Sequence, residues 1–392
     1  MNSLPVRVLY LNHAAKPSGA EIALRRMLNA CDRRRVQPII VFGEEGPAAD
    51  LMREIDVATY VLPLAGKVRE ARKDTLGVGA FMHLGRLVAL GVYAVRLAAF
   101  ARRHKVQIIH TNTIKAHFYG GIAGCLAGLP VVWHLRDFVN ESYFPGAAVR
   151  VIRFLARRLP RHVIAVSHSV MEQLRFDGEP GRATVVLDGL ADQELGTEKS
   201  EPAPRETIRT CIGIVGRLSR WKGQHVFLDA AARVLAAEQD AEFVIIGSAL
   251  FGEDAYEQSL RRQAEALGIA HRVRFRGFTS DVSGELSKLD LLVHASTSGE
   301  PFGQVILEGM AAGLPVIATR GGGVPEIISD GENGLLTRMG DPADLAAALL
   351  ALLSDPAKAR RLGDNGYRHV REKFRASRAA QTVADIYQDI LA

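Results

Sequence analysis

The sequence predicts an α/β protein with parallel β-sheets, divided into two domains. Short apolar segments alternate with helical segments along nearly the whole chain, a pattern typical of strands joined by crossover helices. At 392 residues, the chain is also too long for one ordinary hydrophobic core. Residues 191–208 are rich in Glu, Pro, Thr and Ser and poor in apolar residues, which indicates a linker between the two domains.

Composition indicates a soluble globular protein, with 48% hydrophobic and 23% charged residues. The cysteines, Cys31, Cys125 and Cys211, fit no metal-binding spacing and suggest a reducing compartment. The N-terminus has only a short apolar segment, 6–11, which is interrupted by Arg7 and is typical of a first strand rather than a signal peptide. We therefore expect a cytoplasmic protein.

Positive charge is concentrated in residues 1–190, which carry 26 Lys and Arg against 15 Asp and Glu, whereas the remainder carries 23 against 28. One interpretation is contact with an anionic partner, either the phospholipid surface at the inner face of the membrane or a phosphorylated acceptor. The other is ordinary arginine enrichment on solvated faces. The most hydrophobic helical segment, 81–104, is too short and too charged to span a bilayer. It is either packed on the sheet or a basic amphipathic helix that touches the membrane.

The first predicted domain, residues 1–190, carries two candidate features at strand ends. Gly19 and Glu21 lie at the turn between the first strand and its helix, where a glycine frees backbone N–H groups for an oxyanion. His134 ends a later strand, 131–134, at the sheet edge where ligands bind in open α/β folds. Both features also occur for purely structural reasons. The other strands are expected at 36–42, 58–62, 106–110, 163–166 and 184–187.

The second predicted domain, residues 209–375, begins with strand 210–215 and a loop that contains Arg217 and Lys222. Two fixed cations at the carboxyl end of a strand can hold a diphosphate and stabilise its charge as it leaves. The alternative is two cations on the surface. Later strands are expected at 243–247, 273–275, 289–295, 316–318 and 334–336, followed by a final helix at 376–392.

Residues 296–310 contain two glutamates in a strand–loop–helix context. Glu300 is expected in the loop that follows strand 289–295, and Glu308 just over one turn inside the next helix. The helix start offers backbone N–H groups that lack partners within the helix, those of Phe302, Gly303 and Gln304. Carboxylates accept hydrogen bonds from hydroxyl groups, and such amides donate hydrogen bonds to oxyanions. This combination suits a sugar nucleotide. Two glutamates that never meet a ligand are the alternative.

Together these motifs resemble the retaining glycosyltransferases of family 4 (glycosyl transferases group 1), which have the GT-B fold. The resemblance is carried by Pro-Phe-Gly after Glu300 with Glu308 eight residues on, by the spacing of Arg217 and Lys222 between glycines, and by Gly19 with Glu21. It covers nearly the whole chain. It implies two doubly wound, Rossmann-like parallel-sheet domains that face each other across a cleft, with the final helix crossing back to the first domain.

The resemblance implies that a UDP- or GDP-sugar binds mainly to the second domain. Glu308 would form hydrogen bonds with the ribose hydroxyls. Glu300 and the amides of 302–304 would bind the hydroxyls of the sugar, and Arg217 and Lys222 would bind the diphosphate.

Further roles follow from the same resemblance. Gly322 and Gly323 lie in a glycine run before another helix start and would approach the donor phosphates, and Phe278 lies in the segment that holds the base. From the first domain, His134 would reach the donor sugar, and Gly19 and Glu21 would bind the substrates.

The reaction implied is hexose transfer with retained anomeric configuration to a hydroxyl acceptor, a lipid-linked or polysaccharide precursor of the cell envelope. No cofactor, metal or nucleic acid is expected, and the chain has no Asp-x-Asp motif. The alternatives are an epimerase or hydrolase of sugar nucleotides on the same fold, and a non-catalytic nucleotide-sugar-binding protein. Intact Glu300, Glu308, Arg217 and Lys222 argue against the second, although the departures from the family pattern at Ser18, Asp188 and Ala191 leave room for it. A nicotinamide-dependent oxidoreductase is disfavoured because Gly-x-Gly-x-x-Gly does not follow the first strand.

Overall fold

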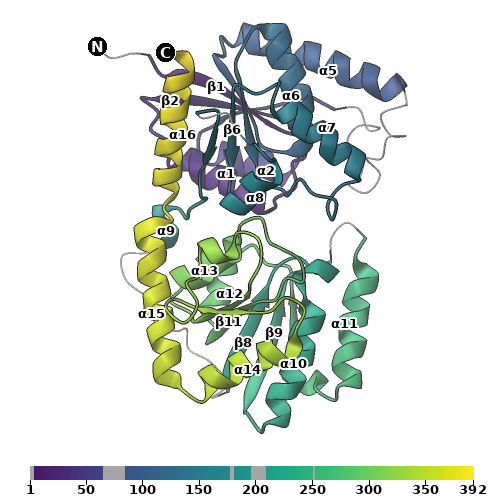
Figure 1. The fold of residues 1–392 in the computed structure, drawn as a ribbon, viewed down its shortest axis with the longest axis vertical. Helices are drawn as coiled ribbons and strands as arrows, with labels where there is room; N and C mark the ends of the chain where they lie inside the picture. The colour runs from purple at the N-terminus through teal and green to yellow at the C-terminus, as the bar shows by residue number, and fades with distance from the viewer. Residues whose placement is uncertain (1–3, 65–83, 177–180, 196–208, 250–251) are drawn as a thin grey trace. The chain divides into compact units, whose positions relative to one another are not determined.

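The computed structural model describes residues 4–64, 84–176, 181–195, 209–249 and 252–392 (Figure 1). Two compact units are present, one made of residues 1–191 with 376–392 and the other of residues 192–375. The predicted linker lies outside the described residues from 196 to 208. All strand pairings within the described sheets are parallel, which confirms the predicted fold class.

The sheet of the first unit has the strand order β3-β2-β1-β4-β5-β6-β7. Its strands are β1 (Val6–Asn12), β2 (Val36–Phe42), β3 (Ala58–Val61), β4 (Ile108–Thr111), β5 (Val131–Leu135), β6 (His162–Ala165) and β7 (Ala183–Val185). The helices are α1 (Gly19–Asn29), α2 (Pro47–Arg53), α5 (Leu84–Arg103), α6 (Ile114–Ala127), α7 (Gly146–Ala156) and α8 (His168–Gln173). The strand order reverses between β1 and β4, so this sheet is doubly wound with its switch point there.

The sheet of the second unit has the order β10-β9-β8-β11-β12-β13 and reverses between β8 and β11. Its strands are β8 (Thr210–Val215), β9 (Ala241–Ile246), β10 (Val273–Gly277), β11 (Leu291–His294), β12 (Val316–Thr319) and β13 (Leu335–Thr337). The helices are α9 (Asp192–Leu195), α10 (Gln224–Ala236), α11 (Asp254–Ala266), α12 (Val282–Leu286), α13 (Gln304–Ala311), α14 (Pro342–Leu353) and α15 (Pro356–Lys373). Both units are therefore doubly wound, as predicted.

The C-terminal helix α16 (Ala376–Leu391) belongs to the first unit. Its apolar face packs into the core formed with β1 and α1, where Val383 and Tyr387 meet Tyr10 and Leu28. A hydrogen bond of 2.9 Å joins the hydroxyl groups of Tyr10 and Tyr387. The end of the chain thus completes the core of the domain in which the chain begins.

Helix α5 covers most of segment 81–104 and has one buried and one exposed face. One face is buried and includes Tyr93 and Leu97, while Val88, Val92 and Val95 are exposed on the other. Within the described residues, no helix is both long enough and apolar enough to cross a membrane.

Candidate functional site

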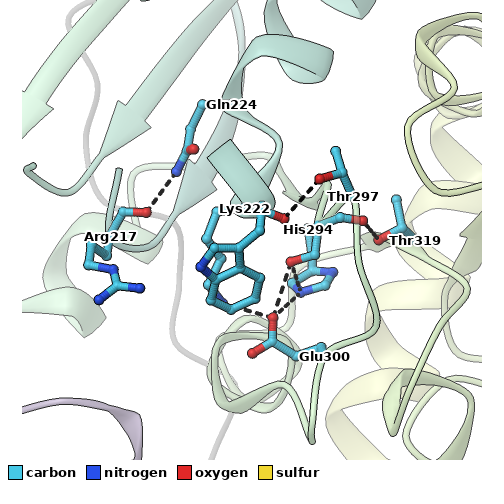
Figure 2. A network of polar contacts seen from close by, with 9 residues as sticks. Arg217, Lys222, Gln224, His294, Thr297, Glu300 and Thr319 are labelled. Carbon is cyan, nitrogen blue, oxygen red and sulfur yellow. Dashed lines mark hydrogen bonds and ion pairs between the residues drawn. The ribbon is translucent and has the colours of Figure 1, made fainter. Parts of the chain in front are cut away.

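The two loops predicted to hold the donor lie side by side at the switch point of the second sheet. Strands β8 and β11 are hydrogen-bonded neighbours, so the loops that follow them leave the same sheet edge. The backbone N–H of Thr297 donates to the carbonyl of Trp221 at 2.8 Å. The side chain of Gln224 donates to the carbonyl of Arg217 at 3.0 Å (Figure 2). These bonds fix both loops in place.

The Glu300 carboxylate is the centre of a polar cluster (Figure 2). Its Oε2 atom accepts hydrogen bonds from Lys222 Nζ at 2.8 Å, from the Ser296 hydroxyl at 3.1 Å and from His294 Nε2 at 3.2 Å. The side chains of Lys222 and Glu300 are 19% and 12% exposed, so the ion pair is partly buried. All three bonds use Oε2, and Oε1 has no hydrogen bond among the described residues.

Glu300 is a fixed anion. Burial alone would raise the pKa of its carboxyl group, but the charge of Lys222 and the hydrogen bond and charge of His294 outweigh burial and hold that pKa well below its usual range. The side chain therefore accepts hydrogen bonds and does not deliver a proton at neutral pH.

Helix α13 begins at this cluster with a backbone that requires glycine. Gly303 has φ of +119°, and a Cβ atom there would lie 2.9 Å from Ile306 Cδ1. Phe302 is buried, with its ring centroid 6.1 Å from that of Phe374, which anchors the helix start in the core. Gln304 is the first helical residue and Glu308 lies half-buried in the next turn, as predicted from the sequence.

The glycine run supports the Glu300 loop in a way that the sequence did not indicate. A Cβ atom at Gly322, where φ is +64°, would lie 2.0 Å from the carbonyl oxygen of Glu300. The amide of Gly323 donates to that same carbonyl at 2.8 Å, which ties the glycine run to the Glu300 loop. The expected helix after these glycines is a single 3-10 turn, Val324–Glu326.

Two further predicted residues follow strands of the second unit, β8 and β10, which lie on either side of β9 in the sheet. Arg217 is half-buried in the loop that also carries Lys222. Phe278 follows β10 and its side chain is 72% exposed. An aromatic ring this exposed offers an uncovered face for a planar ligand group.

In the first unit, Gly19 and Glu21 stand at the start of α1 beside the end of β1. Gly19 is exposed, and the preceding Ser18 does not cap the helix because its hydroxyl donates to the Glu21 carboxylate. The other carboxylate oxygen of Glu21 accepts from Asn12 at 2.8 Å. Glu21 is thus buried and bonded through both oxygens, which makes it a support for the turn.

A buried ion pair stands at the ends of β5 and β7. Arg136 Nη1 contacts both carboxylate oxygens of Asp188, at 2.6 and 2.5 Å, and Arg136 Nε donates to Asn112 at 2.7 Å. The two ionic side chains are only 4% and 8% exposed, and no described residue forms a hydrogen bond with Arg136 Nη2. Asp188, a departure from the family pattern, therefore has a cationic partner in this chain.

His134 lies on β5 and is buried. Its Nδ1 atom is 3.3 Å from His110 Nε2, and its Nε2 atom is covered and has no hydrogen-bond partner among the residues that the structure describes. Burial, reinforced by the charge of Arg136, lowers the pKa of His134 well below its ordinary value. The ring is therefore neutral at neutral pH.

Sequence reasoning missed three polar residues that the structure places in these clusters. His294 and Ser296 end an apolar strand, and their position at a carboxyl end was the available signal. Arg136 lies two residues beyond His134, on the same strand end. Within the described parts of the chain, no group of three or more His, Cys, Asp or Glu side chains is placed to hold a metal ion.

Two doubly wound sheets with polar clusters at their carboxyl edges define the GT-B class of glycosyltransferases. The chain belongs to the glycosyl transferases group 1 family. The model described as "Glycosyl transferases group 1" matches residues 197–369, and the model described as "Glycosyl transferase 4-like domain" matches residues 18–189.

Individual relatives agree with this assignment. The chain is 32% identical to the D-inositol 3-phosphate glycosyltransferase of Corynebacterium diphtheriae, over 76% of this chain and 75% of the relative. It is 29% identical to the N-acetyl-alpha-D-glucosaminyl L-malate synthase of Bacillus anthracis, over 76% and 78%. The crystal structure of Anabaena HepE in complex with UDP-glucose matches with a TM-score of 0.83 and 28% identity, over 98% of this chain and 99% of that one.

Proposed function

We propose that this protein is a retaining hexosyltransferase that moves a sugar from a UDP-sugar to a hydroxyl acceptor. The observation that carries the proposal is the Glu300 cluster. There a fixed carboxylate, whose Oε1 atom has no hydrogen bond to any described residue, stands beside Lys222 and the start of α13. The HepE complex with UDP-glucose, at 28% identity over nearly the whole chain, supports a uridine donor.

In this proposal the second unit stabilises the leaving group. The bond between the anomeric carbon and the diphosphate oxygen breaks, the acceptor oxygen bonds to that carbon, and the acceptor proton passes to a departing phosphate oxygen. Arg217 and Lys222 supply the positive charge that offsets the charge developing on the diphosphate, without a metal ion. Loss of one such preorganised group costs about 3 kcal/mol in other enzymes. His134 would contact the donor sugar from the first unit.

The remaining donor contacts follow the same chemistry. Glu300 Oε1 would accept a hydrogen bond from a sugar hydroxyl, and the Glu308 carboxylate would accept hydrogen bonds from the ribose hydroxyls. The exposed ring of Phe278 would stack on the base.

We propose that the acceptor is anionic, as in a lipid-linked or cell-envelope precursor. Residues 1–190 carry the excess positive charge of the chain. The names of two relatives contain D-inositol 3-phosphate and L-malate, which are both anionic.

Contact with an anionic membrane is a separate part of the proposal. Val92 and Val95 on α5, and Val151 and Phe154 on α7, are exposed apolar side chains, and Arg158 lies 5.5 Å from the Phe154 ring centroid. Apolar side chains among arginines suit the interface of an anionic lipid surface, which would hold the enzyme at the inner face of the membrane.

Calorimetry with UDP, GDP, ADP and UDP-glucose tests the donor assignment. We expect UDP and UDP-glucose to bind, and Glu308→Ala to weaken both because the ribose loses a hydrogen-bond acceptor. If no nucleoside diphosphate binds, the proposal fails. Release of UDP from UDP-glucose without any acceptor would instead indicate hydrolysis.

Flotation with vesicles tests the membrane contact. We expect the protein to float with anionic and not with neutral vesicles, and Phe154→Asp to abolish flotation. Leu267→Asp, at an exposed apolar residue of the second unit, is the matched control and should float normally. Wild-type protein that stays in the soluble fraction would remove this part of the proposal.

A further inference from the structure

Four buried side chains form a continuous chain of hydrogen bonds that ends at His134. The hydroxyl groups of Tyr10 and Tyr387 are 2.9 Å apart, and the Tyr387 hydroxyl is 2.7 Å from His110 Nδ1. His110 Nε2 is in turn 3.3 Å from His134 Nδ1. These residues come from β1, α16, β4 and β5, so this relay connects the C-terminal helix to the edge of the first sheet.

The four side chains of the relay carry one more polar hydrogen than the number of hydrogen bonds between them. Burial lowers the pKa of both histidines well below the ordinary value, so each neutral ring carries one hydrogen, as does each phenol. Four hydrogens and three hydrogen bonds leave one hydrogen without an acceptor. It lies on Tyr10 if every bond donates toward Tyr10, and on His134 Nε2 if every bond donates toward His134.

The two ends of the relay differ in what can satisfy that hydrogen. The Tyr10 hydroxyl lies in the core between α1 and α16, and Tyr387 is its one hydrogen-bond partner among the described residues. His134 Nε2 has no hydrogen-bond partner in the described parts of the chain and stands near the carboxyl end of β5, an edge where ligands bind in doubly wound sheets. A substrate oxygen at Nε2 would therefore complete the relay, once the groups that cover this nitrogen move aside.

We propose that Tyr387 and His110 are positioning residues that present His134 to the donor sugar as a hydrogen-bond donor, through Nε2–H. The direction of the bonds in the complex is then Tyr10 to Tyr387, to His110, to His134 and to a sugar hydroxyl oxygen. This inference rests on the proposed function for the identity of the ligand. It makes the C-terminal helix part of the sugar-binding machinery, although Tyr387 is 277 residues from His110 in the sequence.

Nitrogen-15 NMR of histidine-labelled protein tests the relay, because the shifts of the two ring nitrogens distinguish the tautomers. In the wild-type protein with UDP-glucose, we expect the hydrogen of His134 on Nε2. UDP alone should leave the tautomer mixture of the ligand-free protein, whereas the same change with UDP alone would assign the contact to the diphosphate. Tyr387→Phe should give mixed tautomers and bind UDP-glucose about fivefold more weakly, the effect of about one hydrogen bond.

Tyr119→Phe is the matched control, since Tyr119 is buried in the same unit and its hydroxyl has no hydrogen-bond partner within the described ranges. This variant should keep the wild-type tautomer of His134 and the wild-type affinity for UDP-glucose. Tyr10→Phe should also keep the wild-type tautomer, because Tyr387 still donates to His110. A hydrogen on Nδ1 of His134 in the wild-type complex would overturn the proposal even if Tyr387→Phe did not fold. A Tyr387→Phe protein that matches the control in tautomer and affinity would overturn it as well.

The two proposals fail in different ways. If wild-type protein binds no UDP-sugar, the proposed function fails. The ligand-free spectra then decide the relay: Tyr387→Phe must shift the ring nitrogens of His110 and His134 while Tyr119→Phe leaves them unchanged.

Discussion

Glu300→Gln is an informative perturbation because it removes one charge and keeps the shape of the side chain. Oε2 accepts from Lys222, His294 and Ser296, and the ion pair with Lys222 is mostly buried. The variant leaves the ammonium of Lys222 without its counter-ion. Breaking a fully buried pair costs about 3–5 kcal/mol and an exposed one less than about 1, so we expect the second unit to lose about 2 kcal/mol.

The loss should depend on pH. The pKa of Glu300 is held below that of an unfolded glutamate, about 4.3. Its contribution to the free energy of unfolding is therefore complete above about pH 5 and disappears as the pH falls through the folded-state pKa. Urea unfolding from neutral pH to about pH 3 should show a deficit that is full at neutral pH and shrinks in acid.

Glu257→Gln is the control, because the i,i+4 pair of Glu257 with Arg261 on α11 is exposed and should contribute less than about 0.5 kcal/mol. Calorimetry completes the test: the variant should bind UDP-glucose more weakly than the wild-type protein does, with a smaller effect on UDP. Unchanged stability at neutral pH, or a deficit that is the same at every pH, would refute the argument that Glu300 is a fixed anion.

Three more changes test the remaining geometry. Arg217→Ala should lower kcat about 100-fold with little change in unfolding, which steady-state assays with UDP-glucose measure; a normal kcat would contradict the role in leaving-group stabilisation. Gly322→Ala should weaken donor binding because the added Cβ atom collides with the backbone carbonyl of Glu300. Gly340→Ala is the control: Gly340 has φ of +69° and open space around it, so the variant carries similar backbone strain without the collision. Equal donor affinity in the two glycine variants would argue against the inference that Gly322 supports the Glu300 loop. Arg136→Lys should cost about 2 kcal/mol in urea unfolding because the buried planar contacts are lost, while Arg34→Lys, at an exposed pair, should cost almost nothing.

The sequence by itself determined the fold class, because alternating apolar segments and helices are local patterns that require no knowledge of which strands pair. It also placed Arg217 and Lys222 in one loop and Glu300 in another, each at the carboxyl end of a strand. Turns and the ends of strands depend on residues that are close together in the sequence, so they can be predicted from it. The resemblance to a family then supplied the topology that the local patterns left open.

Only the tertiary structure decided which of these residues meet. Lys222 and Glu300 are 78 residues apart, and Arg136 and Asp188 are 52 apart. They come together because the order of strands in a sheet differs from their order in the chain. The relay from Tyr387 to His134 depends on the same fact, since a helix at the end of the sequence completes the core of the first unit. Such pairings leave no local periodicity, so the sequence could show the parts of each cluster and not their partners.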